Sequence, residues 1–268
     1  MTVRIRRSLP LIVVLTVVAW TTVADANHAW GNYHWATTAI PFTLKTGDNV
    51  SAAWDVYLND AIYDWSQSSV LELTKVAGGS RAKNCRPTSG RIEVCNAAYG
   101  NTGWLGIAQI WASGSHITQG VAKMNDTYFN TATYNSPAWR RLVMCQEVAH
   151  DFGLDHQDEA FNNPNLGSCM DYTSDPDGPP SNEHPNAHDF AQIVDIYDHI
   201  DSTSTISATA PGSAHALDGV DFDSPGQWGR LMRSNANGRV QIYEREMGRG
   251  LKMITHVFWA DPDADRGR

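Results

Sequence analysis

Gln146-Glu147-Val148-Ala149-His150-Asp151-Phe152-Gly153-Leu154-Asp155-His156 is the stretch that decides the fold and the chemistry of this chain. Positions 146 and 150 are one helical turn apart, so their side chains face the same way and can hold one metal ion. Gly153 lets the chain turn sharply, so that His156 returns as a further ligand. Glu147 would lie beside the metal, where a carboxylate can take a proton from a metal-bound water. The stretch therefore predicts a Zn²⁺ site that keeps one position open for water.

The spacing of these residues follows the pattern H-E-x-x-H-x-x-G-x-x-H. Glu147, His150, Gly153 and His156 match it, and Gln146 stands where the pattern has its first histidine. Four matches in one register are far more specific than a bare motif hit. The chain resembles the metzincin clan of zinc metallopeptidases over roughly residues 34–200, and it is closest in layout to matrixin-like and astacin-like secreted proteases.

A second motif downstream supports the resemblance. Cys169-Met170-Asp171-Tyr172 is similar to the Met-turn, the tight turn that places a methionine beneath the metal in that clan. The resemblance implies this structural role for Met170. It also implies that Tyr172 contacts the metal or stabilises the oxyanion, because a tyrosine two residues after the methionine does so in astacin-like and serralysin-like members.

Gln146 decides between two functional interpretations. Loss of the first histidine predicts a catalytically impaired pseudoprotease that keeps the fold and binds peptides or proteins without cleavage. Alternatively, the amide oxygen of Gln146 reaches nearly as far from the backbone as an imidazole nitrogen and can donate a lone pair. An amide oxygen is a poorer donor to zinc than an imidazole, so the expected defect is in holding the metal.

The first 26 residues are typical of a secretory signal peptide. Arg4, Arg6 and Arg7 precede an apolar run, and Ala24-Asp25-Ala26 forms a cleavage site. Removing residues 1–26 takes away three Arg and one Asp, so the formal net charge changes from −9 to −11. Such an acidic chain is not expected to bind nucleic acid or, after signal cleavage, a membrane. We expect a secreted, extracellular monomer.

The mature chain has four cysteines, an even number that predicts two disulfides in an exported protein. Three pairings are possible. Cys85–Cys95 would close a loop flanked by Gly and Pro. Cys145–Cys169 would connect the active-site helix to the loop after it, and these two bonds are the favoured pairing.

Hydrophobic periodicity predicts alternating strands and helices. Helices are expected from Trp54 to Trp65, from Ser136 as N-cap and Pro137 as first residue to about Phe152, and around Phe190 to Tyr197. Strands are expected at Ile40–Leu44, Val70–Val76, Arg91–Ala97, Ile107–Trp111 and His116–Met124, and the last of these has the polar alternation of an edge strand.

The composition changes after residue 201. Residues 27–201 would form the catalytic domain, 202–214 a linker rich in Ser, Thr, Ala, Pro and Gly, and 215–268 a small β-rich appendage that packs on the main domain. Asn237-Gly238 predicts a two-residue hairpin turn in the appendage. Four histidines outside the motif could bind a second metal, but surface or capping roles are favoured for them: His28, His34, His184 and His188.

These observations predict an α+β fold with a twisted mixed sheet and an active-site helix. The expected function is that of a secreted zinc-dependent metalloendopeptidase, with Zn²⁺ on His150, His156 and Gln146, Glu147 as general base, and Tyr172 as oxyanion stabiliser. A polypeptide substrate would lie extended along the expected edge strand His116–Met124. The alternatives are the pseudoprotease and a binding module that acts through the appendage.

Overall fold

The protein is α+β, with one mixed sheet of nine strands and few helices. The computed structural model describes residue 1, residues 29–208 and residues 219–261. The expected signal peptide and part of the expected linker lie outside the described residues. The elements are β1 (His34–Trp35), β2 (Phe42–Asn49), α1 (Asp55–Trp65), β3 (Leu71–Ala77), β4 (Ile92–Ala97), β5 (Trp104–Ser113), β6 (His116–Asn125), α2 (Asp126–Phe129), α3 (Pro137–His150), α4 (Ala187–Ile196), a 3₁₀ turn (Pro225–Gln227), β7 (Arg230–Ser234), β8 (Val240–Gly248) and β9 (Leu251–Trp259).

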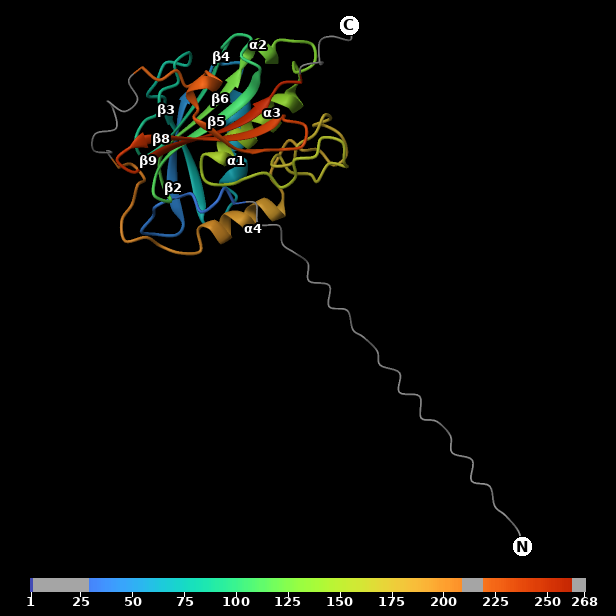
Figure 1. The fold of residues 1–268 in the computed structure, drawn as a ribbon, viewed down its shortest axis with the longest axis horizontal. Helices are drawn as coiled ribbons and strands as arrows, with labels where there is room; N and C mark the ends of the chain where they lie inside the picture. The colour runs from blue at the N-terminus through green and yellow to red at the C-terminus, as the bar shows by residue number, and fades with distance from the viewer. Residues whose placement is uncertain (2–28, 209–218, 262–268) are drawn as a thin grey trace.

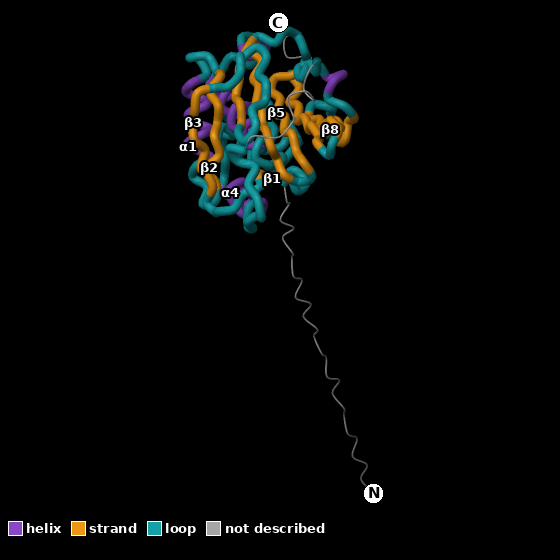
Figure 2. The backbone as a smooth tube through the Cα atoms, turned by 90° about the vertical axis from the view of Figure 1, so that its left-hand side faces the viewer, coloured by secondary structure: helices purple, strands orange, loops and turns teal. Residues whose placement is uncertain are grey.

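The sheet has the strand order β3-β2-β4-β6-β5-β9-β8-β7, and β1 pairs in parallel with the first residues of β6. Strands β2, β3, β4 and β6 are parallel to one another, whereas β5, β9, β8 and β7 form an antiparallel series. Figure 2 shows the strands side by side, from β3 and β2 at one side of the molecule to β8 at the other.

The prediction that His116–Met124 forms an edge strand is wrong. β6 lies between β4 and β5, so neither of its sides is free along most of its length. Its polar side chains are buried because distant segments bind them: Lys123 forms an ion pair with Asp223, and Gln119 donates to the Ser89 hydroxyl. The polar alternation predicted side chains that face solvent, whereas the fold buries them against partners from distant segments.

The C-terminal strands extend the main sheet. β9 pairs with β5 along its whole length, from Trp104 with Trp259 to Ser113 with Leu251. In Figure 1 the orange and red β8 and β9 run beside the green β5 and β6. The expected hairpin joins β7 to β8, but its turn is longer than two residues, because the closing backbone bond joins Asn235 to Val240.

Apolar side chains cover both faces of the sheet. Helices α1 and α3 contact each other, and α3 lies against β5 and β6. Alternation along β9 places Ile254 and Phe258 in the core beneath α3, whereas Met253 and Val257 join a second cluster on the opposite face. His256 has the same parity as Ile254 and Phe258. The strand therefore turns His256 toward α3.

Candidate metal centre

Helix α3 positions the first part of the site. The Ser136 hydroxyl accepts a hydrogen bond from the Trp139 amide at 3.2 Å, and Pro137 opens the first turn, as the sequence predicts. The helix ends at His150. Gly153 has a φ of +100°, and a Cβ there would lie 2.3 Å from the Tyr33 carbonyl oxygen. This position requires glycine, and the turn it makes returns the chain to place His156 beside His150.

The two motif histidines face each other through their Nε2 atoms, which are 2.9 Å apart. The Nδ1 of His150 lies 2.7 Å from the Leu154 carbonyl oxygen, and the Nδ1 of His156 lies 3.2 Å from Glu159 Oε1. Both oxygens can accept a hydrogen bond, which favours the neutral tautomer that carries its proton on Nδ1 in each ring. That tautomer turns both Nε2 lone pairs inward, and it is the arrangement that a metal-ligating histidine adopts.

A third imidazole joins them from β9. His256 is only 1% exposed, and its ring stacks on that of His150 with centroids 3.9 Å apart. Ligand nitrogens of His150, His156 and His256 all lie within 4.8 Å of one another. Neither ring nitrogen of His256 has a hydrogen-bond partner among the described residues. A metal ion bound to one ring nitrogen would offset part of the cost of burying both, and Nε2 also lies 3.8 Å from Asp155 Oδ1.

The three rings fit a metal ion. Tetrahedral zinc with bonds of about 2.0–2.1 Å holds its ligand nitrogens about 3.3 Å apart. The 2.9 Å between the two motif histidines is close to that separation. Three histidines are also a known ligand set of zinc. The described cluster can therefore hold a metal ion.

Gln146 lies in the same buried region. Its side-chain nitrogen donates to the Cys169 carbonyl oxygen at 3.1 Å, and its Oε1 has no hydrogen-bond partner among the described residues. The Cys145–Cys169 disulfide joins the two segments next to this bond, and Cys85–Cys95 is the other disulfide, so both expected pairings are present. Burial of an unsatisfied amide oxygen is costly, and a bound ligand would offset that cost.

Glu147 is buried beneath β5. Burial raises the pKa of its carboxyl group well above the ordinary value. Gly106 of β5 makes room for it, since a Cβ there would lie 2.4 Å from Glu147 Oε1. Asp151 is buried nearby and accepts a hydrogen bond from the Val121 amide at 3.1 Å. Burial, followed by the charge of Glu147, raises the pKa of Asp151 as well.

Met170 and Tyr172 come together with the motif residues. The Met170 carbonyl oxygen accepts a bond of 2.6 Å from the Gln157 amide, directly after His156. The Tyr172 ring lies edge-on to His156, with centroids 4.4 Å apart. Burial, and next the charge of Glu147, raises the pKa of the Tyr172 hydroxyl, which is therefore a neutral donor.

The C-terminal strands close the site. Phe258 of β9 packs edge-on against Tyr172, with centroids 4.6 Å apart. Arg233 of β7 lies 2.6 Å from Asp155 Oδ1 and 2.7 Å from Glu159 Oε1, the carboxylates next to His156. Gln146, Glu147, His150, His156, Tyr172 and His256 are all buried. No polypeptide can reach these residues in the described conformation.

The sequence interpretation missed His256. It lies outside the motif, and its one signal is its alternation with Ile254 and Phe258 in the appendage that was expected to be β-rich. That signal shows which face of the strand carries the ring, but not that the strand pairs with β5.

The two disulfides indicate an extracellular or otherwise oxidising location. Among the described residues, no helix has the length and apolar character needed to cross a membrane. No protein-family model matches the chain, and no curated protein matches it either.

Proposed function

We propose that this chain is a secreted zinc-dependent endopeptidase whose C-terminal strand holds it in a closed, latent form. One observation carries the proposal: three buried imidazoles converge beside a buried glutamate on the helix that bears the protease-like motif. Imidazole ligands suit zinc among the common biological metals. The resemblance of residues 146–156 and 169–172 to metzincin motifs supports peptide-bond hydrolysis as the reaction.

The ligands differ between a closed and an open form. In the closed form, His150, His156 and His256 would hold zinc, with Gln146 Oε1 available as a fourth donor. Four protein ligands are typical of structural zinc sites, which leave no place for substrate. Departure of β9 would remove His256, so that His150, His156 and Gln146 remain and one position opens.

The metal and the residues around it would each have a separate role in peptide-bond hydrolysis. Bound zinc would supply a Lewis acid that makes water acidic enough to react at neutral pH. Glu147 would accept a proton on its carboxylate and return it to the leaving amine, and its raised pKa favours holding that proton between the two steps. The neutral hydroxyl of Tyr172 would donate a hydrogen bond to the carbonyl oxygen under attack.

Strand β5 would bind the substrate. β9 occupies the free edge of β5 as an antiparallel neighbour, with His256 directly opposite Ala108. An extended peptide can make the same backbone hydrogen bonds when β9 has left. We therefore propose β5, in place of the expected β6, as the strand that binds substrate.

The test compares two matched truncations of buried phenylalanines. Phe258→Ala removes the ring that holds β9 against Tyr172, whereas Phe42→Ala removes a buried ring from β2, at the opposite end of the sheet. Each change is expected to cost about 3–5 kcal/mol of stability. Only Phe258→Ala should favour the open form, so it should raise the rate of cleavage of an unfolded protein substrate above that of wild type and Phe42→Ala.

The same assay includes Glu147→Gln in the Phe258→Ala background. That exchange keeps the shape of the side chain and removes the proton acceptor, so cleavage should disappear while zinc stays bound. A non-catalytic protein stabilised by metal is the second candidate, and the complete burial of the site favours it. Bound zinc without any cleavage in Phe258→Ala would establish that candidate and exclude the endopeptidase.

A further inference from the structure

We propose a second zinc site, formed by His34, His199 and Asp201, with His116 paired to the same Asp201 carboxylate. The four residues come from three separate parts of the chain: β1, the start of β6, and the segment after α4. None of them belongs to the motif, and none is needed for the proposed peptidase chemistry. The sequence interpretation expected His34 to be a surface or capping residue, but only 8% of it is exposed.

The donor atoms of His34, His199 and Asp201 all lie within 4.8 Å of one another. His34 Nε2 is 3.3 Å from His199 Nε2 and 3.6 Å from Asp201 Oδ1. His116 Nε2 is 3.0 Å from the same Asp201 oxygen. Zinc with bonds of about 2.0–2.2 Å to nitrogen and oxygen separates its ligand atoms by about 3.3–3.5 Å.

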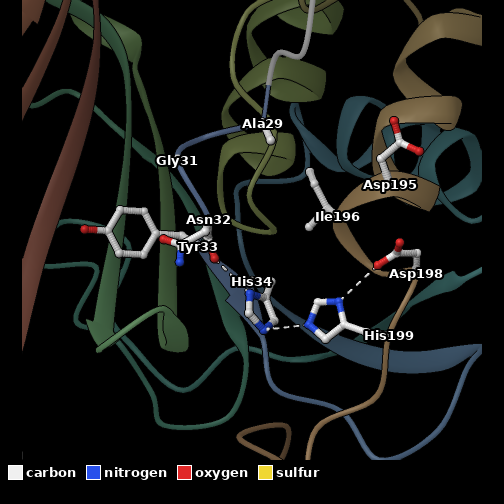
Figure 3. A pocket seen from close by; sticks show the side chains of 9 residues that line it. All are labelled: Ala29, Gly31, Asn32, Tyr33, His34, Asp195, Ile196, Asp198 and His199. Carbon is white, nitrogen blue, oxygen red and sulfur yellow. Dashed lines mark hydrogen bonds and ion pairs between the residues drawn. The ribbon is translucent and has the colours of Figure 1, made fainter.

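The hydrogen bonds behind the rings orient two of the lone pairs. His34 Nδ1 lies 2.8 Å from the Asn32 carbonyl oxygen, and His199 Nδ1 lies 3.2 Å from Asp198 Oδ1. Both acceptors favour a proton on Nδ1, so neutral rings point two Nε2 lone pairs at each other. Figure 3 shows the two rings facing each other in this way. A cation between them removes the repulsion, as in metal sites whose histidines are fixed from behind.

Backbone contacts fix Asp201 before any metal binds. Its Oδ2 accepts a hydrogen bond from the Thr37 amide at 2.9 Å, and its own amide donates to the Thr37 carbonyl oxygen at 2.7 Å. This leaves Oδ1 turned toward His34 and His116. In addition, β1 pairs with β6 so that His34 stands opposite His116, whose Nε2 contacts the same Asp201 oxygen.

The surroundings allow a metal ion to enter. His116 and His199 are partly exposed, and a pocket of about 390 Å³ lies beside His34 and His199. Two imidazoles and one carboxylate can hold zinc and leave its fourth position to water. The ion would join the N-terminal segment to the segment after α4, and the His116–Asp201 pair would connect both to the start of β6. It would hold in place the segment that carries Trp30 and Tyr33, which packs against Gly153 of the motif.

Zinc stoichiometry of the whole chain tests the proposal. Zn²⁺ is titrated into metal-free protein at pH 7.5 against a chromophoric chelator. Wild type should bind two ions, whereas His199→Ala and Asp201→Asn should each bind one. His199→Ala removes a half-exposed ring, and Asp201→Asn keeps the acceptor for Thr37, so both should fold. His184→Ala is the matched control, because it removes an exposed histidine paired with Asp64 elsewhere and should still bind two ions.

Thermal unfolding provides a second readout that does not depend on cleavage. Zinc in large excess over its Kd should raise the Tm of wild type by several degrees more than that of Asp201→Asn. Equal stoichiometry in wild type, His199→Ala and Asp201→Asn would overturn the proposal and leave an ordinary histidine–carboxylate ion pair. One ion in wild type and none in His199→Ala would instead confirm this site and contradict the proposed catalytic one.

Discussion

The imidazole of His256 in β9 stacks on that of His150 at the end of α3, with ring centroids 3.9 Å apart and planes inclined by 12°. Burial, followed by the neighbouring His150 and His156, lowers the pKa of His256 well below its ordinary value. The ring is therefore neutral at physiological pH, which is the form that binds a metal. A strand far along the chain from α3 thus supplies an imidazole to a site in which Gln146 stands in place of the first histidine of the motif.

Removal of His256 should weaken metal binding more than removal of Gln146. In a His199→Ala background, which eliminates the second site, His256→Ala should lower zinc affinity at least about 100-fold, since even residues that only orient ligands are worth 10–100-fold. Gln146→Ala removes a weaker amide donor and should cost less. Chelator competition measures both affinities. Equal losses would mean that Gln146 is as strong a ligand as His256.

Gly106 should tolerate no side chain. A Cβ there would lie 2.4 Å from Glu147 Oε1 and 2.6 Å from a Val143 methyl group, so Gly106→Ala should cost about 1–3 kcal/mol and displace Glu147. Gly226→Ala is the control, because its Cβ would meet nothing closer than 4.0 Å and should change stability by less than about 0.5 kcal/mol. Urea unfolding measures both variants. Similar stabilities would show that β5 can move away from α3.

The Cys145–Cys169 disulfide should stabilise the protein more than Cys85–Cys95. The bonds close sequence separations of 24 and 10 residues, and loop entropy predicts contributions of about 3.5 and 2.7 kcal/mol. Replacement of each pair by alanine, followed by urea unfolding, tests this order. Loss of Cys145–Cys169 should also weaken zinc binding, because Gln146 donates to the Cys169 carbonyl oxygen. Unchanged zinc affinity would show that the Cys145–Cys169 disulfide has no effect on the metal centre.

Asp189 should make the protein less stable as the pH rises from about 4 to 6. Burial raises its pKa from 3.8 to about 6, so the folded state binds the proton more tightly than the unfolded state over that interval. Unfolding free energy then falls with pH, by about 3 kcal/mol for a shift of about two units. Asp189→Asn does not titrate and keeps an acceptor for Ser168. The unfolding free energy of Asp189→Asn should match that of wild type near pH 4 and exceed it at pH 7. If the unfolding free energies of the two proteins instead change with pH in parallel, the raised pKa of Asp189 is contradicted.

Local features of the fold were predictable because short-range chemistry determines them. Ser136 and Pro137 predicted the start of α3, and the structure confirms both roles. The apolar period from Trp54 to Trp65 predicted α1, and the separation of the cysteines favoured the two disulfides that the structure contains. Each of these features depends on residues within a few turns or one loop.

Long-range pairing was not predictable in the same way. Alternation along β9 shows that Ile254, His256 and Phe258 share a face, but it carries no information about which strand lies alongside. The burial of Lys123 depends on Asp223, about 100 residues later. For the same reason, the position of β9 beside β5 and the cluster of His34 with Asp201 could be seen only in the folded structure.

X-ray absorption at the zinc edge tests the central claim most directly. The sample is the His199→Ala chain with one equivalent of Zn²⁺, compared with the same chain that also carries His256→Ala. The account predicts three imidazole ligands in the first sample and two in the second. The same number of imidazoles in both samples, or no bound zinc in the first, would contradict the claim that β9 completes the metal centre.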